Sequence, residues 1–216
     1  MHGARRRGGG TCPTEGIATA MKRKATISRK TKETDIRLEL SLDGKGLSNI
    51  DTGIPFMDHM LRLTAAHGFM DLSIAARGDT EIDDHHTVED LGICLGSAIR
   101  EALGDRKGLK RYGQAAVPMD EALARVVLDI SNRPFLAYRV SLKESKTGRF
   151  DVHLLKEFFR ALVNHSGMTL HVDLFSGDDA HHIAEAIFKA FARALDQAVT
   201  IEARLEGTVP STKGVL

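Results

Sequence analysis

Histidine and glutamate side chains occur in the same arrangement at two places in the chain. The first copy reads His-His-Thr-Val-Glu over residues 85–89, and the second reads His-His-Ile-Ala-Glu over residues 181–185, 96 residues later (181 − 85). Imidazole nitrogens and carboxylate oxygens are ligands that suit divalent zinc, manganese, iron or nickel. One such motif is explained equally well as an ordinary helix end, but two copies at a fixed offset indicate a metal centre.

Helical geometry predicts how these ligands divide between ions. An α-helix turns about 100° per residue, so the first histidine and the glutamate of each motif lie one turn apart on one face. The second histidine of each pair points about 100° away from the first. We therefore expect the two adjacent imidazoles to bind different ions.

The repeat extends beyond the two motifs. Apolar residues at helical spacing follow each motif, and the upstream segments 57–79 and 155–177 both pass from helical periodicity through a turn into strand-like alternation. In this alignment His59 falls opposite Glu157, and both are candidate ligands. Internal duplication is the economical explanation. It predicts an α+β fold of two similar halves, each with a mostly antiparallel sheet covered on one face by helices.

Periodicity and turn residues also predict the elements and their grouping. The predicted strands are 24–30, 34–42, 122–131 and 135–142, and the predicted helices include 54–68 and 151–167, the latter with Asp151 as its N-cap. The predicted organisation is a disordered N-terminal extension (1–21), a first half-repeat (22–112), a second half-repeat (113–207) and a C-terminal substrate-binding tail (208–216). Met21 is an alternative start of translation.

Composition narrows the class of protein. The 30 basic and 29 acidic residues nearly balance, so no net charge indicates nucleic acid or a membrane as a partner. No segment reaches the roughly 18 apolar residues of a membrane span, and the N-terminus lacks the apolar core of a signal peptide, so we expect a cytoplasmic protein. Cys12 and Cys94 give no disulfide framework, and Cys94 is expected to be a buried thiol.

Five segments carry a resemblance to a known family. They are DTGIPFMDHML (51–61), DDHHTVEDLGICLG (83–96), SNRPF (131–135), DAHHIAEAIFKAFARAL (179–195) and VPSTKG (209–214). Together they resemble imidazoleglycerol-phosphate dehydratase, which converts imidazole glycerol phosphate to imidazole acetol phosphate and water in histidine biosynthesis. The resemblance implies a duplicated α+β fold with two manganese ions per active site. It also implies a homo-24-mer with sites where subunits meet.

The resemblance also assigns roles to residues. The implied metal ligands are His59, His85, His86, Glu89, Glu157, His181, His182 and Glu185. At position 157 plant-type members carry histidine; glutamate is still a manganese ligand, and His153 is an alternative. The implied substrate contacts are Glu33, His59, His67, Arg111, Arg133, Lys189, Ser211, Thr212 and Lys213. Among them Glu33 is the expected general acid and base, and the arginines with the tail form a phosphate cradle.

The predicted chemistry explains why metal ions are needed. The hydrogen that is lost is not adjacent to a carbonyl group, so a general base alone would be inadequate. Metal coordination favours an ionised imidazole ring, whose electrons expel the neighbouring hydroxyl group. A binuclear phosphoester metallohydrolase and a non-enzymatic metal-storage cage are the alternatives, and the same ligands accept manganese, iron, cobalt, nickel or zinc.

Overall fold

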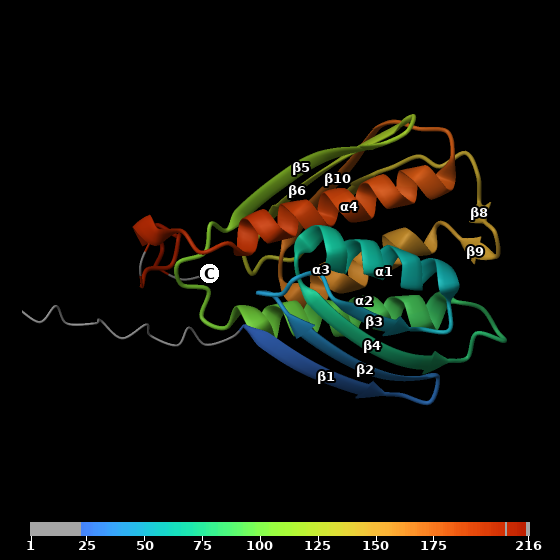
Figure 1. Ribbon diagram of the computed structural model, residues 1–216, viewed down its shortest axis with the longest axis horizontal. Helices are drawn as coiled ribbons and strands as arrows, with labels where there is room; N and C mark the ends of the chain where they lie inside the picture. Colours follow the sequence, from blue (N-terminus) through green and yellow to red (C-terminus); the bar gives the residue numbers. More distant parts are fainter. Residues whose placement is uncertain (1–22, 206, 215–216) are drawn as a thin grey trace, which may run out of the picture.

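The computed structural model describes residues 23–205 and 207–214, which form two halves of similar construction (Figure 1). The first half contains β1 (Lys24–Lys30), β2 (Thr34–Ser41), β3 (Ser48–Asp51), α1 (Pro55–Gly68), β4 (Asp71–Gly78) and α2 (His85–Leu103). The second contains β5 (Tyr112–Met119), β6 (Ala122–Asp129), β7 (Phe135–Arg139), α3 (Leu154–Ser166), β10 (Thr169–Ser176) and α4 (Ala180–Val199). A hairpin of β8 (Lys146–Thr147) and β9 (Phe150–Asp151) precedes α3, and a short 3-10 helix, η1 (Ala203–Leu205), follows α4.

The two sheets have the same topology. Their strand orders are β1-β2-β4-β3 and β5-β6-β10-β7. In each sheet the first three strands pair antiparallel and the last strand pairs parallel to its neighbour. The predicted α+β fold of two similar halves is confirmed. The exact half-repeat boundaries stay a prediction, and the predicted extension 1–21 lies outside the described residues.

The helices form a layer between the two sheets (Figure 1). Helix α2 packs on β1 and β2, and α4 packs on β5 and β6. Strand alternation produces this arrangement: in β2 the side chains of Ile36, Leu38 and Leu40 are buried, whereas the residues between them are exposed. Each sheet therefore buries one face against helices, as predicted.

Close packing of α2 on α3 joins the two halves into one core. Gly92 and Gly96 lie one turn apart on α2, and a Cβ added at these positions would come within 2.5 Å of the Phe158 carbonyl oxygen and 2.4 Å of the Leu162 carbonyl oxygen. On its other side α3 presents Phe159, whose ring lies 5.4 Å from that of Phe191 on α4. The backbone of α2 thus touches that of α3, and α3 in turn packs against α4.

The structure differs from the sequence prediction at several elements. Asp151 is not the N-cap of α3, because it pairs with Lys146 in the β8–β9 hairpin and the helix begins at Leu154 with His153 as N-cap. Periodicity also did not reveal β3, β5 or that hairpin. Cys94 is fully buried as predicted, and burial raises the pKa of its thiol to about 11. No helix among the described residues is long and apolar enough to cross a membrane.

Gly92→Ala tests the close contact between α2 and α3. We expect a loss of about 1–3 kcal/mol in the free energy of unfolding, because the added methyl group must push the two backbones apart. The measurement is the apparent melting temperature, with Ser97→Ala on the same helix as a control that should change little. Helix propensity alone would favour alanine by about 1 kcal/mol, so an unchanged or higher melting temperature would contradict the packing argument.

Candidate active site

Both histidine motifs lie on the first turn of a helix, held there by an aspartate. At the start of α4 the Asp179 carboxylate accepts hydrogen bonds from the backbone N–H groups of His181 (2.7 Å) and His182 (3.2 Å). At the start of α2 the Asp83 carboxylate accepts one from the N–H of His85 at 2.8 Å. These aspartates occupy equivalent positions of the repeat. The duplicated unit therefore includes this aspartate contact as well as the ligands, although Asp179 is the N-cap of α4 whereas the N-cap of α2 is Asp84.

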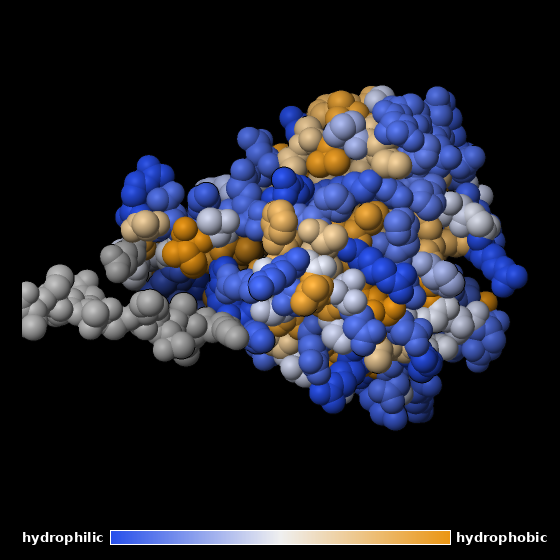
Figure 2. Space-filling view, in the orientation of Figure 1, coloured by the Kyte–Doolittle hydropathy of each residue, from blue (hydrophilic) through white to orange (hydrophobic). Residues whose placement is uncertain are grey.

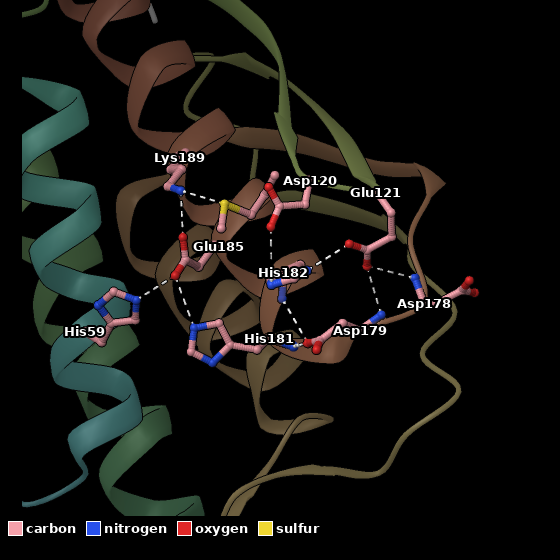
Figure 3. A network of polar contacts seen from close by, with 10 residues as sticks. His59, Asp120, Glu121, Asp178, Asp179, His181, His182, Glu185 and Lys189 are labelled. Atoms are coloured by element: carbon pink, nitrogen blue, oxygen red, sulfur yellow. Dashed lines mark hydrogen bonds and ion pairs between the residues drawn. The ribbon is translucent and has the colours of Figure 1, made fainter.

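Three predicted ligands converge between α1 and α4. Glu185 Oε1 lies 2.8 Å from His59 Nε2 and 3.1 Å from His181 Nε2 (Figure 3). All three potential ligand atoms lie within 4.8 Å of one another. Two imidazole nitrogens and a carboxylate oxygen at this spacing fit the donor set of a divalent transition metal.

Glu185 carries a negative charge in this environment. Burial alone would raise its pKa, but hydrogen bonds from Lys189, His59 and His181 outweigh burial and hold the pKa at about 2. Lys189 Nζ donates to the second carboxylate oxygen at 2.6 Å, which leaves Oε1 toward the two imidazoles. His67, at the end of α1, has a lowered pKa because of burial and the positive charge of Lys189. His67 therefore belongs to the same electrostatic environment.

The first motif is arranged more openly. His85 Nε2 lies 3.9 Å from Glu89 Oε2, and His86 Nε2 lies 4.0 Å from Glu33 Oε1. On its other side His86 Nδ1 pairs with Asp79 Oδ2 at 2.9 Å, and this hydrogen bond raises the pKa of His86. The sequence prediction of Glu33 as a site residue therefore has a geometric basis, because Glu33 faces a predicted ligand.

Adjacent histidines diverge in both motifs, as the helical geometry predicts. The rings of His85 and His86 have centroids 6.2 Å apart and an interplanar angle of 78°. For His181 and His182 the values are 6.4 Å and 90°. The two imidazoles of a pair consequently face different surroundings, one toward the glutamate of its own motif and the other toward acidic residues of a neighbouring turn.

Asp90 fixes the turn that carries Glu33. This buried side chain of α2 accepts a hydrogen bond from Thr34 Oγ1 and forms an ion pair with Arg29 Nε at 2.9 Å. The Arg29 contact is an ion pair rather than an aligned hydrogen bond, because Nε has no hydrogen-bond partner of good geometry within the part of the chain that the structure describes. Within the turn, Thr31 Oγ1 accepts from the N–H of Glu33 at 3.0 Å. Sequence reasoning missed Asp90, although a carboxylate in an otherwise apolar helical stretch was a signal.

The predicted phosphate cradle lies at the other end of α4. Arg111 is buried and forms a two-pronged ion pair with Asp129, with N···O distances of 2.6 and 3.0 Å. Its third nitrogen donates to the Pro210 carbonyl oxygen at 2.7 Å, which brings the predicted tail residues 211–213 to the same place. Arg133 has an exposed side chain and lies 3.7 Å from Asp129 Oδ2, an oxygen that Arg111 also contacts.

Helix α4 separates this cradle from the second metal motif. The N–H of Arg111 donates to the Ala198 carbonyl oxygen near the C-terminal end of α4, whereas His181 is on its first turn. A helix of 20 residues is about 30 Å long at about 1.5 Å per residue. Glu157, on α3, pairs with Arg160 at 3.0 Å and does not belong to the convergent group. Within one chain, therefore, the predicted site residues are divided between two ends.

The comparisons with known proteins identify the family. A family model described as imidazoleglycerol-phosphate dehydratase matches residues 52–195 of the chain. The chain belongs to the imidazoleglycerol-phosphate dehydratase family. Curated dehydratases from Geobacter metallireducens and Geobacter sulfurreducens are both 59% identical to it over 196 residues, which cover 91% of this chain and 100% of each relative.

Solved structures of imidazoleglycerol-phosphate dehydratases have the same fold. The Staphylococcus aureus enzyme is 44% identical with a TM-score of 0.76, covering 82% of this chain and 99% of that one. The Pyrococcus furiosus enzyme, in complex with (S)-C348, is 41% identical with a TM-score of 0.76, covering 88% and 100%. The predicted activity, a carbon–oxygen hydro-lyase of histidine biosynthesis, is confirmed by this family membership.

Proposed function

We propose that this chain dehydrates imidazole glycerol phosphate with two divalent ions, both manganese, in each active site. Neighbouring copies of the chain would complete each site. The observation that carries this proposal is the separation of the phosphate cradle from the second metal motif by the length of α4, about 30 Å. A substrate with a three-carbon chain between imidazole and phosphate is far shorter than this distance. A second copy is needed to bring a cradle next to a metal motif.

The outer face of the second sheet supports self-association. Tyr112, Phe135 and Phe175 are 56–59% exposed on this face, beside Arg125 and Arg139. The outer face of the first sheet presents charged side chains such as Asp35 and Arg37. Figure 2 shows hydrophobic residues gathered over the β5–β6 hairpin and mainly hydrophilic ones over the first sheet. Exposed aromatic side chains on one face are typical of protein–protein interfaces. The family's 24-subunit arrangement is the assembly that we propose.

The proposed metal ligands form two groups. The ligand atoms of the first group already lie close together within one chain, and the second group would need ligands from a partner subunit to complete a metal site. His59, His181 and Glu185 would hold one ion. The other proposed ligands lie outside this group and are His85, His86, Glu89, Glu157 and His182. A bound ion would supply Lewis acidity that favours the ionised form of the substrate imidazole.

The residues of the chain would bind and orient the substrate around these ions. Arg133, exposed beside Asp129, and Lys213 of the tail supply positive charge for the phosphate group, while Arg111 holds the tail in place through Pro210. Lys189 and His67 lie on the other side, beside Glu185. The phosphate and the imidazole would thus be fixed from two subunits, with the two hydroxyl-bearing carbons between them.

Glu33 would move the proton during dehydration. The reaction breaks the C–O bond on the carbon next to the ring and the C–H bond on the following carbon. Glu33 is exposed on its turn and faces His86, so its carboxylate is free to take the carbon-bound proton. Delivery of this proton to the leaving hydroxyl group would release water and return Glu33 to its ionised form. The resulting enol gives the ketone when the enol proton moves to the carbon next to the ring.

Metal removal tests the proposed cofactor. Protein stripped with a chelator should give no imidazole acetol phosphate from imidazole glycerol phosphate, and added manganese should restore product formation. The product is detected through its ketone group, which the substrate lacks. Release of inorganic phosphate without a ketone would instead favour the phosphoester-hydrolase alternative, and metal uptake with neither product would favour storage.

Glu33→Gln tests the proton-transfer role. We expect a loss of at least about 100-fold in kcat, because the amide takes up no proton at neutral pH, while manganese content stays at the wild-type level. Lys32→Gln, in the same turn, is the control and should retain most of the activity. A Glu33→Gln variant with kcat near wild type would remove Glu33 from this role.

Mixed oligomers test the division of the site between subunits. One variant would lack the cradle charges (Arg133→Ala with Lys213→Ala) and the other would lack a metal ligand (Glu185→Ala), so each alone should be inactive. In randomly mixed oligomers about one site in four would pair an intact cradle with an intact motif, so activity should return to that level. Co-expressed, doubly tagged oligomers that stay inactive would show that each chain builds its site alone.

A further inference from the structure

Glu121 joins the ring of a metal-motif histidine to the start of its helix. This residue lies in the turn between β5 and β6, far in sequence from α4. Its Oε2 pairs with His182 Nδ1 at 2.8 Å (Figure 3). Its Oε1 accepts hydrogen bonds from the backbone N–H groups of Asp178 at 3.2 Å and Asp179 at 3.0 Å. One carboxylate therefore contacts both the ring and the segment that leads into the helix.

The contact at Nδ1 determines whether the other ring nitrogen, Nε2, has a lone pair available for a metal ion. A neutral imidazole carries its proton on one nitrogen only, and a carboxylate beside Nδ1 favours the proton there. The lone pair is then on Nε2, the atom that a metal ion would bind. In His182 this Nε2 faces away from Glu121, toward Asp120 Oδ2 at 3.7 Å.

In the first half a carboxylate also contacts Nδ1 of the second histidine, but this carboxylate comes from a different element. His86 Nδ1 is held by Asp79, which directly follows β4, whereas His182 Nδ1 is held by Glu121 from the β5–β6 turn. The carboxylates therefore do not come from equivalent positions of the duplicated unit. The contact at Nδ1 is the common feature of both halves although its source differs, which indicates that the ring orientation itself is required.

We propose that Glu121 is a positioning residue for the metal centre: it keeps His182 protonated at Nδ1, turns Nε2 outward, and ties this orientation to the start of α4. The inference rests on the proposed function, because an oriented Nε2 matters only if it binds an ion. Partners of this kind are worth a factor of about 10–100 in metal affinity.

Glu121→Gln separates ring orientation from support of the helix. The amide oxygen of glutamine still accepts from the Asp178 and Asp179 N–H groups, but its NH2 group donates to Nδ1 and so places the ring proton on Nε2. We expect manganese binding to metal-free oligomer, measured by titration calorimetry, to weaken about 10–100-fold for one class of sites. Glu202→Gln is the matched control, since Glu202 is also a carboxylate with a pKa of about 2 but, among the described residues, forms an ion pair only with Arg204.

Melting temperatures of the metal-free and manganese-loaded variants distinguish a loss of metal binding from a general loss of stability. If Glu121 positions the ring, Glu121→Gln leaves the melting temperature of metal-free protein unchanged and reduces only the increase that manganese produces. Glu121→Asp, which keeps the charge, should recover part of the affinity. Equal manganese affinity in wild type and Glu121→Gln, or a loss of metal-free stability that accounts for the weaker binding, would overturn this proposal alone. Wild-type protein that bound no manganese would overturn the metal assignment as well.

Discussion

The placement of both histidine pairs on the first turn of a helix is the constraint on which the site depends. The N-terminal end of a helix carries a partial positive charge, which opposes the binding of a cation. The structure offsets this charge with carboxylates at the same place: Asp179 accepts from the free N–H groups of α4, and Glu121 adds a charge from another element. The pKa of Glu121 is about 2, so this charge is present at any physiological pH. A helix start becomes suitable for a cation only with such acidic neighbours.

These carboxylates also connect the site to the scaffold. Glu121 belongs to a β-hairpin of the second sheet, and Asp90 joins α2 to the hairpin turn of the first sheet that carries Glu33. Because α2 and α4 each pack on the hairpin that contacts them, this packing holds the ligand-bearing turns beside the acidic turns. The site is therefore built on rigid elements, which is what precise positioning of metal ligands requires.

Sequence reasoning was most successful where the relevant interaction was local. The four-residue spacing within each motif was enough to predict that His181 and Glu185 meet and that adjacent rings diverge, since helical geometry fixes both. Residues whose partners lie far away in sequence were not found: Glu121 is 61 residues from His182, and no periodicity links them. Asp151 was misassigned for a similar reason, because its pairing with Lys146 in a hairpin overrides the local preference for a cap. The phosphate residues came only from the family resemblance, and the ligand role of Glu157 stays a prediction.

The contact between α2 and α3 lies at positions where the two halves differ. In the alignment of the two halves Phe188 is equivalent to Gly92 and Ala192 to Gly96, so α4 carries side chains at two positions where α2 has none. An ancestral pair of identical half-chains would have met at a symmetric surface, with the same residues on both sides. In this chain the residues differ: glycine at 92 and 96 lets the backbone of α3 approach α2, and the equivalent positions of α4 carry side chains. The close contact therefore fixes which half takes which place. A copy of the second half in the place of the first would bring the Phe188 side chain to the position of Gly92, where even a Cβ would lie 2.5 Å from the Phe158 carbonyl oxygen.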